Sequence, residues 1–88
     1  MVINITDLKK KIIYRSNYRG TKEMDKLLSS FTKKHINQLE ESELLLLSNL
    51  LEIDDENLYK FNQGQQTTID FESNTITDLF KKFIYTNE

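Results

Sequence analysis

Apolar residues recur three and four positions apart along most of the chain, the spacing that places side chains on one face of an α-helix. The clearest case is residues 24–31, where Met24, Leu27, Leu28 and Phe31 form one apolar face. Such patterns predict helices over about residues 7–18, 21–35, 41–52, 54–64 and 73–84. We therefore predict an all-α fold, a compact bundle of four to five short helices forming a single domain over residues 1–88.

Capping residues predict where several helices begin and end. Thr6, Thr21 and Asp54 are expected to start helices, because their side-chain oxygens can accept hydrogen bonds from free backbone amides. Asp55 is expected to help cap the same helix as Asp54. Gly20 is expected to end the first helix in the left-handed conformation, as Gly64 would end the fourth, because glycine tolerates a positive φ. Ile84 is placed on the apolar face of the last helix.

The composition restricts the chemistry. The chain has no cysteine and a single histidine, His35, near the predicted end of the second helix, where cations are favoured. Asp54, Asp55 and Glu56 lack the spacing and glycine of a calcium loop, and no phosphate-binding glycine loop is present. We therefore predict a protein that is not an enzyme, with no catalytic residue and no metal site.

The N-terminal sequence and the lack of a long apolar run bear on location. No apolar run approaches the roughly 20 residues that span a bilayer. The first residues, MVINITDLKKK, do not resemble a signal or transit peptide. We expect a cytoplasmic protein with no membrane partner.

The charge is divided between the two parts of the chain. Residues 1–36 hold nine basic and three acidic residues, a net +6, whereas residues 37–88 carry a net −8. The basic part also has two tyrosines, Tyr14 and Tyr18, so a small antitoxin or another nucleic-acid-associated helical protein is one alternative. The acidic part argues against a dedicated nucleic-acid binder, and the two parts could also neutralise each other by packing together.

Residues 15–25, RSNYRGTKEMD, contain the only two arginines of the chain, directly before Gly20. A planar guanidinium is favoured where a forked or stacked contact is needed, and a partner, or Glu23 and Asp25, could supply it. From the residues alone, a capped helix corner and a docking surface for another protein both remain possible.

The order of these residues resembles the small succinate dehydrogenase assembly factors, or flavinylation factors, whose signature is Arg-Gly-x-x-Glu. Here the signature is Arg19, Gly20 and Glu23, and a second block, LLEIDDENLYKFNQG at residues 50–64, is similar as well. The resemblance covers roughly residues 8–64.

This chain departs from the family pattern at two positions. Phe61 stands where the family often has tryptophan, which we expect to affect packing rather than function. Glu40 stands where a serine cap would be more usual, so we expect the third helix to fray at its start.

The resemblance implies a five-helix bundle that binds the flavoprotein subunit of succinate dehydrogenase, and sometimes that of fumarate reductase. It implies that the factor promotes covalent attachment of FAD to a histidine of that subunit and holds no cofactor stably itself; we expect a monomer. Carried over to this chain, Arg19 and Glu23 would make paired polar contacts with the partner, and Gly20 would let the two backbones approach closely. The residues expected to flank this contact are Arg15, Ser16, Tyr18 and Asp25.

The resemblance also leads to an expectation about folding and keeps one more alternative open. If Arg19 and Glu23 are exposed interface anchors, replacing either by alanine should weaken binding with little effect on folding. A helical adaptor with some other partner also stays open, and identification of the bound partner would separate it from the assembly factor.

Overall fold

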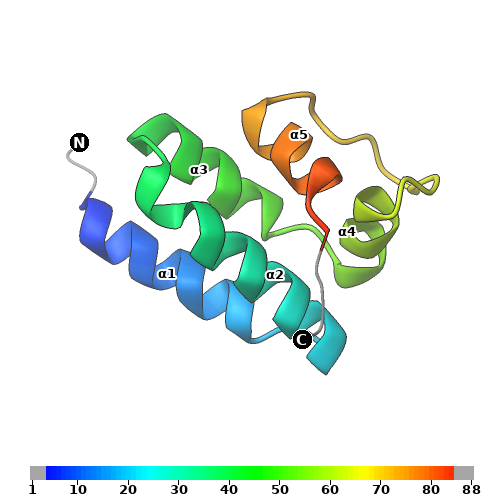
Figure 1. Cartoon of the computed structure of the whole chain (residues 1–88), viewed down its shortest axis with the longest axis horizontal. Helices are drawn as coiled ribbons and strands as arrows, with labels where there is room; N and C mark the ends of the chain where they lie inside the picture. Colours follow the sequence, from blue (N-terminus) through cyan, green and yellow to red (C-terminus); the bar gives the residue numbers. More distant parts are fainter. Residues whose placement is uncertain (1–3, 85–88) are drawn as a thin grey trace.

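The structure is a computed structural model that describes residues 4–84. It contains, in chain order, α1 (Ile5–Asn17), α2 (Lys22–His35), the short 3-10 helix η1 (Ile36–Gln38), α3 (Glu41–Leu50), α4 (Asp55–Asn62) and α5 (Thr75–Lys82) (Figure 1). The described part of the chain has no strand, so the prediction of an all-α bundle of four to five short helices is confirmed. Within residues 4–84, every helix is too short or too polar to cross a membrane.

The helices pack around one apolar core. α1 and α2 run alongside each other, α3 packs against α1 and α5, and α4 packs against α5, so that α4 and α5 lie on the side away from the first helix (Figure 1). The predicted apolar face of α2 is buried, as are leucines of α3 that lie in the centre of the bundle. The buried apolar residues are Ile12, Met24, Leu27, Leu28, Phe31, Ile36, Leu44, Leu47, Leu50, Leu51, Leu58, Ile76 and Phe80.

Three of the predicted helix ends are confirmed. Thr21 Oγ1 accepts a hydrogen bond from the Met24 amide at 3.2 Å, and Asp54 Oδ2 accepts one from the Asn57 amide at 3.1 Å. Gly64, which follows α4, has a φ of 74°, the left-handed conformation that glycine adopts without strain. These ends follow from local chemistry, which the sequence displays directly.

Other predicted ends are wrong. Asn4, not Thr6, caps α1, because that helix already begins at Ile5 and the Asn4 side chain accepts from the Asp7 amide at 3.2 Å. The start of α3 is tied rather than frayed, since the Glu43 carboxylate accepts a hydrogen bond from the Glu40 amide at 3.0 Å. 

The last helix is also shorter than predicted. Ile84 was expected on its buried face, but α5 ends at Lys82 and Ile84 is 81% exposed. The turn into extended backbone at Phe83 takes Ile84 out of the helical period on which that prediction depended.

Two asparagines of α4 make hydrogen bonds across the fold, one to the loop that follows α4 and one to the end of α5. The buried Asn57 donates to Thr68 Oγ1 at 2.9 Å and accepts from the Thr68 amide at 2.9 Å. Asn62 donates to the carbonyl oxygens of Phe80 and Phe83, at 2.8 and 2.9 Å, and so satisfies acceptors at the end of α5. Asn57 therefore holds the loop at Thr68, and Asn62 joins the end of α4 to the end of α5.

Phe61 packs in this same region. Its ring stacks on that of Phe71, with ring centroids 4.1 Å apart and an interplanar angle of 11°. The aromatic residue at this position thus helps to fix the loop that precedes α5, a contact that a larger ring would alter through packing.

Candidate functional site

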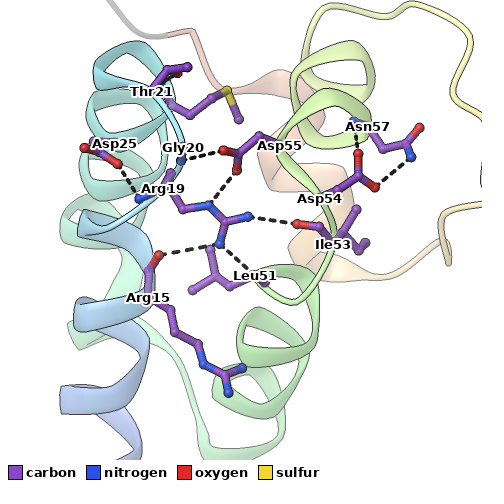
Figure 2. Close-up of polar contacts among 11 residues, drawn as sticks. Arg15, Arg19, Gly20, Thr21, Asp25, Leu51, Ile53, Asp54, Asp55 and Asn57 are labelled. Atoms are coloured by element: carbon purple, nitrogen blue, oxygen red, sulfur yellow. Dashed lines mark hydrogen bonds and ion pairs between the residues drawn. The ribbon is translucent and has the colours of Figure 1, made fainter.

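Both arginines extend from the end of α1 toward the turn that joins α3 to α4 (Figure 2). We call residues 18–23 the corner and residues 51–55 the turn. Arg15 Nη1 lies 3.1 Å from Glu52 Oε1, in an ion pair whose acidic side chain is largely exposed. The Arg19 side chain is only 10% exposed, because its guanidinium lies between the corner and the turn.

The Arg19 guanidinium uses all three of its nitrogens inside the protein. Nη1 donates to the Leu51 carbonyl at 2.7 Å and Nη2 donates to the Ile53 carbonyl at 2.8 Å, while Nε lies 2.8 Å from Asp55 Oδ1. The carbonyls follow the C-terminal end of α3, where a positive charge is stabilised by the helix dipole. The planar fork of an arginine can reach three acceptors at once, whereas a lysine amine could not do so with this geometry.

Asp55 completes this network from the first residue of α4. One carboxylate oxygen, Oδ1, accepts from Arg19, and the other, Oδ2, accepts from the Gly20 amide at 2.8 Å (Figure 2). A carboxylate is also favoured at a helix N-terminus. Asp55, which was predicted to cap α4 beside Asp54, instead binds the corner, and that part of the prediction is wrong.

Asp54 carries out the capping alone. It accepts hydrogen bonds from the Asn57 side chain at 2.9 Å and from the Asn57 amide at 3.1 Å, on the opposite side of the turn from Asp55 (Figure 2). These bonds, with the side-chain bond contributing most, hold the pKa of Asp54 below its ordinary value because they stabilise the carboxylate.

Gly20 does not adopt the left-handed conformation that was predicted for it. Among residues 4–84, a positive φ occurs only at Gly64. Asp55 instead approaches Gly20 closely: a Cβ at residue 20 would lie 3.0 Å from Asp55 Oδ2, tighter than an ordinary van der Waals contact. Gly20, three residues beyond the end of α1, is thus in contact with a distant residue and is not the left-handed end of that helix.

The predicted site residues divide into an exposed and an internal group. Tyr18, Gly20 and Glu23 are exposed, and the Tyr18 ring lies 4.6 Å from that of Tyr14, with both rings more than half exposed. Internally, Ser16 is 1% exposed and donates to the Ile13 carbonyl at 2.8 Å.

The contacts of the other two internal residues, Asp25 and Arg19, differ from those that were expected. Asp25 Oδ1 accepts a hydrogen bond from the backbone amide of Arg19, not from either guanidinium. The expectation that the Arg19 side chain is exposed is wrong, because it is 10% exposed and its donors already have acceptors in the turn. The predicted pairing of Arg19 and Glu23 at a partner is not tested by these contacts and stays a prediction.

Comparison with known proteins identifies the family. A family model described as "flavinator of succinate dehydrogenase" matches residues 10–84. The chain belongs to this flavinator family. The match confirms the resemblance that the sequence suggested and includes both the corner and the turn. No match is found among curated proteins or among solved structures.

The two sequence blocks that resemble the flavinator family form a single site in the structure. The first block contributes Arg19 and Gly20, and the second contributes Leu51, Ile53 and Asp55, more than 30 residues further along the chain. Sequence reasoning identified both blocks but did not place them together. The signal that could have joined them was the surplus of acidic residues in the second block, opposite the two arginines of the first.

The described residues offer few groups for chemistry of their own. His35 lies at the end of α2, with its ring 4.9 Å from that of Phe31. Partial burial lowers the pKa of His35, and the positive charge of Lys34 lowers it further. Residues 4–84 contain no group of three or more histidine, cysteine or acidic side chains placed to hold a metal ion. The flavinator family is a family of assembly factors.

Proposed function

We propose that the chain binds the flavoprotein subunit of succinate dehydrogenase, its client, and promotes covalent attachment of FAD to a histidine of that subunit. The observation that carries the proposal is the match of residues 10–84 to the flavinator family. In this proposal the new bond forms between the flavin and the client, so the chain supplies no reacting group and binds no FAD stably.

The proposed mechanism is conformational. A factor that binds one conformation of its client more tightly raises the population of that conformation. If histidine and flavin are aligned in the bound form, the attachment becomes faster, because correctly oriented groups react far more readily than groups that must first find each other. The factor can then dissociate unchanged.

The corner is the proposed contact surface. Tyr18, Gly20 and Glu23 are exposed there, and Gly20 presents backbone without a side chain. Arg19 and Asp25 support this surface from inside by fixing its backbone. Binding to a preorganised surface loses less conformational entropy than binding to a mobile one, which favours affinity.

Further parts of the proposal concern the setting. We place the protein in the cytoplasm as a monomer, with the flavoprotein subunit of fumarate reductase as a second possible client. Arg15 and Ser16 flank the corner on α1, and of these only Arg15 has a partly exposed side chain with which to reach a client.

A titration with a matched control tests the proposal. Glu23 and Glu41 are both exposed and both lie in the first turn of a helix, so that truncation removes the same local interaction with the helix dipole. We expect Glu23→Ala to weaken binding to the purified flavoprotein subunit by about 30-fold, the effect of losing an interface anchor of ~2 kcal/mol. Glu41→Ala should bind like the natural chain.

Two results would count against the proposal. Absence of binding by the natural chain would reject the flavoprotein subunit as client. Equal affinities of Glu23→Ala and Glu41→Ala would reject the corner as the contact surface.

A further inference from the structure

Asp55 lies outside the Arg-Gly-x-x-Glu signature, yet its carboxylate holds two signature residues at once. Its two oxygens accept separately from Arg19 Nε and from the Gly20 amide, each at 2.8 Å. The side chain is about three-quarters buried, so these bonds are partly shielded from water. Hydrogen bonds to an ionised acceptor are roughly twice as strong as neutral ones.

The other contacts that α1 and the corner make with the turn differ in kind. The Arg15–Glu52 pair involves a 63% exposed carboxylate, and exposed ion pairs contribute little. Arg19 reaches the carbonyls of Leu51 and Ile53, but these bonds hold its side chain and not the backbone of the corner. Within residues 4–84, only the Asp55 side chain joins the turn to a backbone amide of the corner.

Gly20 fits this arrangement for a steric reason. Its φ is not positive, so an L-residue could adopt its backbone conformation. A Cβ would meet Asp55 Oδ2 at 3.0 Å, with no other non-neighbouring atom of residues 4–84 within 4 Å. The requirement for glycine inside this chain therefore comes from one carboxylate oxygen.

We propose that Asp55 is the positioning residue of the client-binding corner and the reason why residue 20 of the signature is glycine. The inference rests on the proposed function, since it takes the corner as the surface that meets the flavoprotein subunit. Asp55 does not itself touch the client in this account. Its carboxylate holds the Gly20 backbone at a fixed position. The same carboxylate also holds Arg19, so that residues 51–55 and the corner move as one unit.

The first test uses the free protein and needs no client. In the natural chain we expect Gly20→Ala to lower the melting temperature by about 4 °C or more, and in an Asp55→Ala background by about 1 °C or less. Asp55→Ala alone should shift the Gly20 amide resonance and accelerate its hydrogen exchange about tenfold or more, because a charge-assisted hydrogen bond is lost. Equal effects of Gly20→Ala in both backgrounds, or an unchanged Gly20 amide, would overturn the inference.

The second test separates positioning from general stability. Asn57 lies on the same helix and is buried, and its side chain bonds Thr68 of the loop and Asp54 of the turn but no residue of the corner. At a temperature where both variants remain folded, we expect Asp55→Ala to bind the flavoprotein subunit about tenfold more weakly than the natural chain, and Asn57→Ala to bind within about threefold of it. The Gly20 resonance should stay in place in Asn57→Ala.

The outcomes distinguish the two proposals. Normal binding by Asp55→Ala, or an equal loss in Asn57→Ala, would refute positioning by Asp55 even if the natural chain binds its client. Failure of the natural chain to bind would instead refute the proposed function and with it the role of Asp55 in docking. In that case the measurements on the free protein would still decide whether Asp55 explains the glycine.

Discussion

Replacing Arg19 by alanine tests whether the signature arginine supports the fold. The substitution removes three hydrogen bonds of 2.7–2.8 Å from a side chain that is 10% exposed, and it leaves Asp55 and two carbonyls without that donor. Hydrogen bonds with one charged partner contribute about 1.5–3 kcal/mol each. Because the Asp55 side chain is 27% exposed, water can replace part of the loss, and we expect a net destabilisation of about 2–4 kcal/mol.

The size of this effect is large for such a small protein. Domains of this length have a free energy of unfolding of about 5–15 kcal/mol, so Arg19→Ala would remove a substantial part of it. One kcal/mol shifts the melting temperature of a 60–100-residue domain by about 4–8 °C, which predicts a decrease of about 10–25 °C. The sequence alone had led us to expect little change in folding.

Urea denaturation followed by circular dichroism, with thermal melts of the same samples, measures the effect. Glu23→Ala is a suitable control, because Glu23 is exposed and its loss should change the free energy of unfolding by about 0.5 kcal/mol or less. Arg15→Ala, which removes only an exposed ion pair, should lose about 1 kcal/mol or less. A loss in Arg19→Ala no larger than in Glu23→Ala would refute the structural role of the arginine.

Three further predictions concern sites away from the corner. Asn57→Ala should destabilise the fold by about 1–3 kcal/mol and make loop 65–72 more sensitive to limited proteolysis, and unchanged cleavage of that loop would contradict the anchoring role. Gly64→Ala should lose about 1–2 kcal/mol in urea titrations from its backbone conformation alone, because no described atom lies within 4 Å of the new Cβ; a neutral effect would speak against the left-handed turn. Partial burial lowers the pKa of His35, so its contribution to stability is present above the unfolded pKa of about 6.5 and is lost as the pH falls through the folded value. His35→Gln should therefore flatten the decrease in melting temperature on acidification below neutral pH, and an unaltered pH profile would exclude this contribution.

Several helix positions were predictable from local chemistry. The apolar face of α2, the Thr21 cap and the Gly64 helix end all depend on residues within a few positions of one another. The sequence displays such neighbours directly, so spacing and capping rules apply. The same rules placed five helices in the correct order and assigned them the correct type.

The corner was less predictable because it is formed by distant residues. Glycine after a helix usually signals a left-handed end, which holds for Gly64, but at Gly20 the determining neighbour is Asp55, 35 residues away. Two acceptors of Arg19 are backbone carbonyls, which every residue carries and which no pattern of side chains can reveal. The sequence could therefore indicate that an arginine fork was needed, but not that the protein itself supplies its partners.

The match to the flavinator family and the structure of the corner support different parts of the account. The family match supports the choice of client and the reaction that is promoted. The structure indicates which signature residues are free to meet that client, namely Gly20 and Glu23, and which one is engaged inside, namely Arg19. An Arg19 variant can therefore lose client binding because the protein unfolds, whereas a Glu23 variant should lose binding because a contact with the client is removed.

Covalent flavin on the client is the most direct measure of the central claim. The flavoprotein subunit would be denatured, separated by gel electrophoresis and examined for flavin fluorescence, in cells with and without the gene for this chain. We predict that deletion removes most of the fluorescence, and that the natural chain and Glu41→Ala restore it whereas Glu23→Ala and Gly20→Arg do not. Equal fluorescence of the subunit with and without the gene would contradict the account.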